Sequence, residues 1–403
     1  MLFIFNELFY IELTLINDIV QCLRHCTEQI VIMKRFIYIL LFCLLISCES
    51  KVQIINSENF KQDVHRFPFS TYNMLCVELY EDNLYHTNRL DNRHLLLYDF
   101  KRNIIDTIIS DNKVIDIIVV NDSSIFYTDY QIGNYLLKNA NDNSYDYFKD
   151  VHNTVSHPYW RDDYQCISVF PTQPLTMTDP KSGIVSCVRK HIFAEDYSVI
   201  LENDIPVYLR FEIAADSSII PVSFFGEYPK NHPKENYYDG GILYYFYNHK
   251  SKEIITHTAV DDYVVLCDSM GNKIQDVYFG SQLYQYSPFS IDKKNKMAES
   301  INHYYNTTLY SYIGFDEYRN IYYRWMSLPR KKDEDSMIKE DIVDYILIVA
   351  DEKFNIKYEV FFDGDKYYPI PADDLINEKG LLIYEKENKE WKGSHTAAWF
   401  VFK

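Results

Sequence analysis

Short apolar runs alternate with polar turns along residues 51–403. The runs are rich in Ile, Val, Tyr and Phe, and no stretch with helical periodicity is longer than three turns. These residue types fit a pleated, half-buried surface, so the pattern predicts β-strands joined by turns. We therefore expect a nearly all-β fold.

One hairpin pattern occurs three times. Apolar runs lead into five-residue turns that open with Asp and close with Asn, at 99–103, 268–272 and 351–355. Asp opens such turns by accepting hydrogen bonds from the nearby backbone, and Asn tolerates the left-handed conformation.

A second pattern is an acidic or Gly turn that enters an apolar strand. Its anchors fall at positions 84, 125, 184, 243, 321 and 381, at intervals of 41, 59, 59, 78 and 60 residues. Six units of this size predict a six-bladed β-propeller with four-stranded antiparallel blades. A pair of β-sandwiches is the alternative fold.

The last unit is short of one strand. It offers strands near 368–370, 381–384 and 397–402, and an unpaired strand edge is a liability in a β protein. Residues 52–55 are strand-like and otherwise unassigned. We expect this N-terminal strand to pair with the blade that contains 397–402 and to close the ring.

A lipoprotein signal precedes this domain. Basic residues at 34–35 are followed by an apolar stretch at 36–46, which is too short to span a bilayer comfortably. The sequence Leu-Ile-Ser-Cys at 45–48 matches a bacterial lipobox, so we expect cleavage before Cys48 and acylation of that residue. The membrane is then a partner through the lipid at Cys48. An uncleaved membrane helix is the alternative.

The signal divides the chain into four expected parts. Residues 33–47 are the signal peptide, 48–56 the anchor, short tether and closing strand, and 57–403 a single propeller domain. We interpret residues 1–32 as an upstream extension, with translation beginning at Met33. An amphipathic leader is the alternative for that segment.

Charge and composition narrow the classes of partner. The formal net charge is −18, whereas binding to nucleic acid needs clustered Lys and Arg, so no nucleic-acid partner is expected. Aromatic residues make up 16% of the chain, and its acidic groups keep such a protein soluble.

No catalytic or metal-binding motif is present. The nucleophile elbow, the P-loop, the dinucleotide fingerprint, the H-E-x-x-H pattern and calcium-loop spacing are all absent. Cysteines at 76, 166, 187 and 267 lack C-x-x-C spacing, so we expect no cofactor and no metal. A disulfide between Cys166 and Cys187 is left open.

Three weaker features are candidates for ligand binding. His152, His157 and Trp160 lie on one long loop, for which solvated loop residues are the alternative interpretation. Arg324 lies between aromatic residues in a strand, where pairing with a carboxylate or stacking on a ring is the structural alternative. The aromatic run 244–247 would suit sugar rings, but burial in a strand also explains it.

The lipobox, the Asp–Asn hairpins, the strand 318–324 and the ending 380–383 with 399–402 resemble a known family. They are similar to the propeller-like lipoproteins of anaerobic Gram-negative bacteria grouped as domain of unknown function 4221. The resemblance covers about Lys51 to Lys403 and implies a fold but no catalytic residue. The chain departs from the family's C-terminal His-Pro-Asn-like turn, because residues 386–392 occupy that place.

These features predict a lipid-anchored binding or sensing module in the outer membrane, facing the periplasm or the cell surface. Its ligand would be a glycan, a peptide or a protein. One alternative is a glycan-active enzyme with paired carboxylates in the propeller funnel. Another is a structural subunit of an outer-membrane complex. Fold alone does not choose among them.

Overall fold

The structure of the protein is a computed structural model. It describes residues 54–67, 74–88, 94–109, 114–121, 124–129, 135–139, 145–148, 164–165, 176–179, 181–186, 188–189, 208–214, 219–226, 243–285, 306–331, 343–368, 375–386 and 396–403. All of them belong to the compact unit Val52–Lys403, which is separate from Met1–Lys51. Among these residues no helix is long and apolar enough to cross a membrane.

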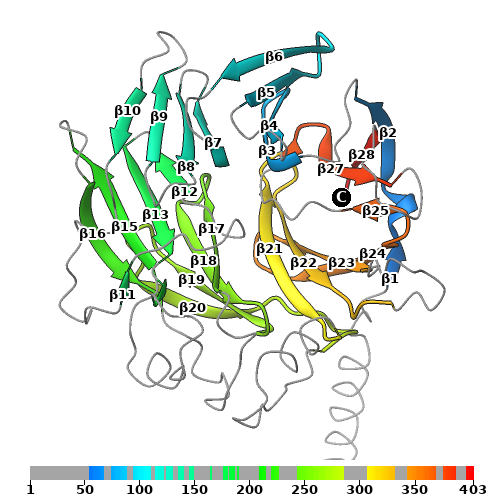
Figure 1. The fold of residues 1–403 in the computed structure, drawn as a ribbon. Helices are drawn as coiled ribbons and strands as arrows, with labels where there is room; N and C mark the ends of the chain where they lie inside the picture. The colour runs from blue at the N-terminus through cyan, green and yellow to red at the C-terminus, as the bar shows by residue number, and fades with distance from the viewer. Residues whose placement is uncertain are drawn as a thin grey trace, which may run out of the picture. The chain divides into compact units, whose positions relative to one another are not determined.

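The described residues are β-strands and turns, with one short 3-10 helix, η1 (Ser57–Asn59). The first sheet consists of β3 (Met74–Tyr80), β4 (Asn83–Asn88), β5 (His94–Asp99) and β6 (Ile104–Ile109). The second consists of β7 (Val114–Asn121), β8 (Ser124–Asp129), β9 (Tyr135–Asn139) and β10 (Tyr145–Phe148). The third consists of β12 (Thr176–Asp179), β13 (Ser182–Ser186), β15 (Tyr208–Ile213) and β16 (Ile219–Phe225). Figure 1 shows these strands in chain order.

Two further sheets follow the same plan. One consists of β17 (Leu243–Asn248), β18 (Glu253–Thr258), β19 (Tyr263–Cys267) and β20 (Lys273–Tyr278). The other consists of β21 (Leu309–Asp316), β22 (Ile321–Ser327), β23 (Tyr345–Asp351) and β24 (Ile356–Phe362). A small ribbon pairs β11 (Tyr164–Gln165) with β14 (Val188–Arg189). The chain is thus an all-β propeller with four-stranded antiparallel blades.

Five blades consist of four strands paired in chain order, with β14 intervening between β13 and β15 in the third, whereas six such units were expected. The remaining strands form a composite sheet from β25 (Tyr367–Tyr368), β26 (Ile376–Asn377), β27 (Gly380–Glu385), β28 (Thr396–Phe400) and a strand from the N-terminal side, β2 (Lys61–Arg66). Both β25 and β26 pair with β27, at opposite ends of that strand. The difference arises because the last segment supplies too few strands for a blade of its own, as the sequence indicated.

The pairing expected for residues 52–55 is wrong. Strand β1 (Ile54–Asn56) lies parallel to β24, with Ile54 opposite Glu359, and therefore extends the preceding sheet. Asn56 then caps η1, its side chain accepting a hydrogen bond from the Glu58 N–H at 2.9 Å, and the chain turns away. It is β2 that pairs with β28, with Val64 opposite Ala398. In Figure 1 this pair joins the blue and red ends of the described chain.

All three expected Asp–Asn turns are confirmed. The side chains of Asp99, Asp268 and Asp351 each accept two backbone hydrogen bonds from the turn that they open, at 2.8–3.0 Å. The left-handed residue is Asn103 in the first turn, with φ 55°. In the other two turns it is the residue before Asn, Gly271 with φ 89° and Phe354 with φ 61°.

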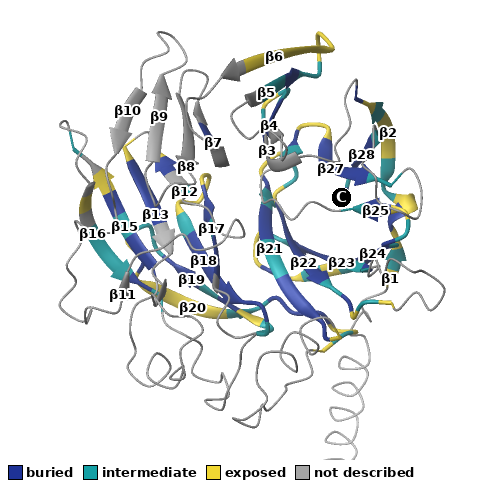
Figure 2. Cartoon of the chain, viewed as in Figure 1, coloured by how far each residue is buried: buried dark blue, intermediate teal, exposed yellow. Residues whose placement is uncertain are grey.

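Burial follows strand position within a blade, as Figure 2 shows. The third strand β23 is buried at five successive residues, whereas the outermost strand β20 is exposed at its first four. One apolar cluster runs through three sheets, because Leu84 and Tyr98 pack with Ile321, Leu381 and Trp399 in it. The composite sheet therefore shares its core with the sheets on both sides.

The first strands of successive sheets also touch. Contacts join β3 to β7, β7 to β12, β12 to β17, β17 to β21, β21 to β26 and β26 to β3. The alternative of two sandwiches does not fit this cycle, because a sandwich packs two sheets face to face.

Candidate functional site

The two ends of the sheets carry very different connections. Short turns join the first strand to the second, and the third strand to the fourth, in these sheets. Their lengths range from two residues, as at 81–82, to five residues, as at 214–218. We call this end the turn end. The strand ends that the other connections join lie at the opposite end of the sheets; these connections include 149–175, 279–308 and 328–344. We call it the connection end, and propellers bind ligands among loops of this kind.

Arg324 lies on β22 and is fully buried, with 0% of its surface exposed. Its Nη2 donates to the Asp261 carbonyl at 2.7 Å, and its Nη1 donates to the Phe279 carbonyl at 2.9 Å. Both acceptors belong to the neighbouring blade β17–β20. The guanidinium also lies 3.8 Å from the centre of the Tyr310 ring. The stacking interpretation is therefore confirmed, and no part of the side chain faces solvent in this structure.

His257, on β18, completes the surroundings of this cation. Its Nδ1 lies 3.2 Å from Arg324 Nη2 and its ring stacks on Tyr244, with centroids 5.1 Å apart. Burial, and then the charge of Arg324, hold the pKa of His257 well below its usual value. Burial lowers the pKa of Arg324 to about 10, so the arginine is the charged member of the pair at neutral pH.

Two adjacent carboxylates lie beside this pair at the connection end. Asp261 and Asp262 are half-buried in the connection between β18 and β19. The Asp262 side chain accepts a hydrogen bond from the Tyr310 hydroxyl, and Asp261 accepts one from the Tyr263 N–H at 2.9 Å. Burial is the main cause of a raised pKa at Asp261. We call Arg324, His257, Tyr310, Asp261 and Asp262 the Arg324 cluster.

The buried carboxylate of Glu359 binds the first residues of the connection that follows β20. Glu359 on β24 is 0% exposed; it accepts hydrogen bonds from the Ser281 hydroxyl and the Gln282 N–H, both at 2.7 Å. The Ser281 N–H in turn donates to the Tyr310 hydroxyl at 2.9 Å. Burial raises the pKa of Glu359. The backbone that leaves β20 is thereby held against the Arg324 cluster.

The sequence analysis did not identify Asp261, Asp262 or Glu359 as site residues, because none of them belongs to a known motif. A usable signal was present: Asp261 and Asp262 form an acidic pair between two apolar strands, and Glu359 is a single acid inside an apolar run. A carboxylate buried in a strand requires partners, and the search for such partners leads to Ser281 and Gln282.

The other predicted residues give a mixed result. His152, His157, Trp160 and Cys48 lie outside the described residues, as do Cys166 and Cys187. Tyr244, Tyr245 and Tyr247 are each 6% exposed, so the aromatic run is packed inside its blade.

Side chains that could coordinate a metal ion do not cluster in the described ranges. No group of three His, Cys, Asp or Glu side chains there is placed to hold an ion. Cys267 is a buried free thiol whose pKa burial raises to about 11, which disfavours the reactive thiolate.

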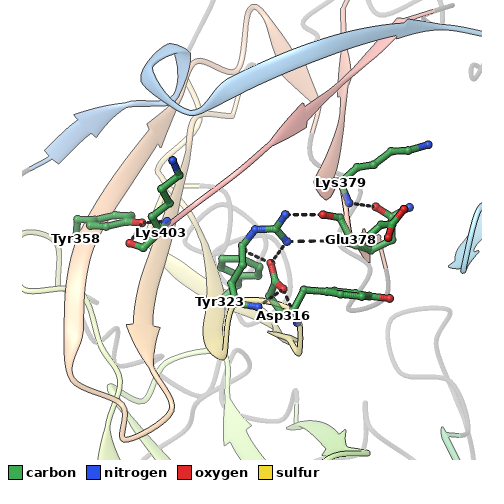
Figure 3. A network of polar contacts seen from close by, with 9 residues as sticks. Asp316, Tyr323, Tyr358, Glu378, Lys379 and Lys403 are labelled. Carbon is green, nitrogen blue, oxygen red and sulfur yellow. Dashed lines mark hydrogen bonds and ion pairs between the residues drawn. The ribbon is translucent and has the colours of Figure 1, made fainter.

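The turn end contains a different network, shown in Figure 3. Asp316 is fully buried and accepts hydrogen bonds from Arg319 Nη1 at 2.8 Å and from the Tyr323 hydroxyl at 3.0 Å. Arg319 also donates to the Glu378 carbonyl at 2.6 Å, and the Asn377 side chain donates to the Glu81 carbonyl at 3.1 Å. These bonds tie three neighbouring turns together.

Comparisons with known proteins bear on the fold. No family model and no curated protein matches the sequence. A crystal structure of a member of the DUF4221 family from Bacteroides vulgatus matches 87% of this chain and 98% of its own, with TM-score 0.65 and 15% identity. The resemblance to domain of unknown function 4221 is therefore supported at the level of the fold.

Two other solved structures are more distant. A luciferin-regenerating enzyme covers 84% of this chain and 95% of its own at 8% identity and TM-score 0.42. A structural genomics protein of unknown function from Bacteroides thetaiotaomicron covers 86% and 75% at 11% identity and TM-score 0.39. Likenesses this weak carry no functional argument.

Proposed function

We propose that the chain is a lipid-anchored, extracytoplasmic binding or sensing module that takes its ligand at the connection end of the propeller. The observation that carries the proposal is the contrast between the two ends. At the turn end, hydrogen bonds tie three neighbouring turns together. At the other end, the described start of the connection 279–308 lies beside the half-buried pair Asp261 and Asp262, since the Phe279 N–H donates to the Asp262 carbonyl at 2.9 Å.

The ring in this proposal has six blades, the composite sheet being the sixth. Two contacts support it: β26 touches both β21 and β3, and β2 supplies the outer strand beside β28. A closed ring leaves no unpaired edge between its first and last blades. It also gives the connection end a fixed frame on which loops can hold a ligand.

The ligand class follows from charge. The chain has a net charge of −18, and the described polar groups at the connection end include two half-buried carboxylates. Carboxylates accept hydrogen bonds from hydroxyl and ammonium groups. We therefore propose a neutral glycan or a basic peptide as the ligand and the membrane as the site of action.

The anchor is tested by substitution. Cys48→Ala should give an unprocessed precursor without palmitate label, because the lipidated thiol is lost. Cys43→Ala, in the apolar part of the signal, is the matched control and should label normally. Undiminished labelling of the Cys48 variant contradicts the anchor.

The binding role is tested with the purified mature protein on arrays of neutral oligosaccharides and basic peptides. Asp261→Asn should weaken capture at least tenfold if its carboxylate binds the ligand, and Asp276→Asn, on the exposed strand β20, should not. Equal capture by both variants contradicts a ligand site at Asp261, and steady turnover of an oligosaccharide contradicts a pure binding role.

A further inference from the structure

We propose that a surface at the connection end of the blade β17–β20 binds the basic side chain, a lysine or an arginine, of a peptide ligand. The surface consists of Tyr263, Tyr278, Asp261 and Asp262, and we call it the Tyr263 surface. All four residues belong to the described range 243–285. This inference rests on the binding role proposed above and names the chemical group that the site takes.

Backbone contacts bring these side chains together. Tyr263, the first residue of β19, lies opposite Tyr278, the last residue of β20. The Phe279 N–H donates to the Asp262 carbonyl at 2.9 Å. Gly280 passes so close to Asp262 that an added Cβ would lie 2.6 Å from the Asp262 Cβ. The chain that leaves β20 therefore packs directly against Asp262, beside the aromatic pair.

One ring of the aromatic pair is open to solvent. Tyr263 is 50% exposed, whereas Tyr278 is half-buried. The two ring centroids are 5.5 Å apart and the ring planes meet at 79°, so the edge of one ring contacts the face of the other. This contact positions the Tyr263 ring while half of its surface stays exposed. The face of an aromatic ring attracts lysine and arginine side chains through its electron density.

Both carboxylates of the surface retain an acceptor oxygen. Asp261 binds the Tyr263 N–H through Oδ1 at 2.9 Å, and Asp262 binds the Tyr310 hydroxyl through Oδ1. No donor among the described residues binds the Oδ2 atom of either side chain. Burial, and then the charge of Asp262, raise the pKa of Tyr278, so this charge lies near the aromatic pair. Carboxylates form their strongest hydrogen bonds with charged donors.

The balance of charge favours a cation over a neutral sugar. Arg324, buried beside the two aspartates, offers one positive charge against two negative ones. The lysines within residues 243–285 lie at the turn end, at 250, 252 and 273. The Tyr263 surface therefore keeps a negative charge beside an exposed ring. A sugar would stack on the ring and leave that charge unpaired, whereas a basic side chain matches both features.

Fluorescence anisotropy tests the surface with three labelled probes. These are tetralysine, its Nε-acetylated form, which has the same length without the charge, and maltotetraose, which represents a neutral glycan. Full-length protein in a polyoxyethylene detergent should bind tetralysine about tenfold more tightly than either of the others, because only tetralysine brings a charged donor.

Three variants separate the ring from general attraction to an acidic protein. Tyr263→Leu keeps apolar bulk on β19 but removes the aromatic face, so tetralysine binding should weaken about fivefold. Tyr263→Phe keeps the face and should stay within about twofold of the wild type. Tyr318→Leu alters a ring that is 53% exposed at the turn end and should have no effect. Melting temperatures verify that the variants fold.

The outcomes are distinguishable. Tetralysine binding that Tyr263→Leu leaves unchanged overturns the Tyr263 surface. Tighter binding of maltotetraose than of tetralysine overturns the basic ligand and leaves the binding role standing. Equally weak binding of all three probes also overturns this inference, whereas the binding role itself fails only if the arrays described above capture nothing.

Discussion

At the scale of residues, buried polar groups are the most informative feature of the molecule. Arg324, Asp316 and Glu359 are each 0% exposed, and each is matched by several partners. A buried charge is tolerated only when it is paired and hydrogen-bonded. Two of the three bind groups of a neighbouring blade, since Arg324 contacts the Phe279 carbonyl and Glu359 contacts Ser281. These side chains therefore hold neighbouring blades in place.

Arg324→Ala should lower the free energy of unfolding by about 3–5 kcal/mol, because the part-buried Asp261 carbonyl and the buried Phe279 carbonyl lose their donor. Urea unfolding measures the change. Arg102→Ala is the control, since that side chain is 76% exposed and its ion pair with Asp99 should contribute about 0–1 kcal/mol. Unchanged stability with lost ligand binding would instead assign Arg324 to a ligand site.

The pKa of His257 gives a prediction about pH. Burial and the neighbouring Arg324 depress this pKa in the folded state, so the unfolded chain binds the proton more tightly. Stability should therefore fall as the pH drops below about 6.5, by up to about 1.4 kcal/mol per pH unit from this group. His257→Gln should remove that component of the slope between pH 6.5 and 5. An identical slope in both proteins would contradict the assignment.

At the scale of elements, the turns do more than reverse the chain. The turn 317–320 is closed on Asp316, which accepts backbone hydrogen bonds from Tyr318 and Arg319 at 3.0–3.1 Å. The same turn extends Arg319 to the turn between β26 and β27. On the other side, Asn248 donates to the Tyr322 hydroxyl at 2.6 Å. Each of these turns therefore connects its own blade to the next.

Asp316→Ala should lower the free energy of unfolding by about 3 kcal/mol or more, because it breaks a buried ion pair and removes the acceptor of the turn. Asp276→Ala is the matched control: Asp276 pairs with Lys273 over the same i,i+3 spacing, but its side chain is 51% exposed. We expect a change of less than about 1 kcal/mol there. Similar losses in both variants would show that burial does not decide the difference.

At the scale of the whole molecule, the N-terminal segment joins two sheets. β1 extends the sheet of β24, and β2 pairs with β28. Lys366 Nζ also donates to Glu58 at 2.5 Å, which fixes the link between them. The blades next to this junction should therefore unfold together, because the pairing connects the first described residues to the last.

Val64→Pro tests this connection. The Val64 side chain is 53% exposed, so the substitution acts through the backbone by restricting φ and removing the N–H. The free energy of unfolding should fall by about 2–3 kcal/mol, and amides of β28 and β4 should exchange faster together. Val64→Thr keeps the backbone and should change stability by about 0.5 kcal/mol or less. Faster exchange in β2 alone would contradict a cooperative junction.

The sequence by itself determined what depends on local order. Alternating apolar runs predicted the strands, and Asp followed four residues later by Asn predicted three turns, because these patterns act within a few residues of backbone. The incomplete last unit even indicated that another segment must join it. The resemblance to domain of unknown function 4221 held at the level of the fold.

Only the tertiary structure decided which strand fills that place, since 52–55 and 61–66 are both strand-like and the choice depends on where η1 turns the chain. It also decided the surroundings of Arg324. Its partners Asp261 and Phe279 are 63 and 45 residues away in sequence, and no local pattern links them. Packing between blades brings these groups together, because a buried cation must find its acceptors wherever the fold places them.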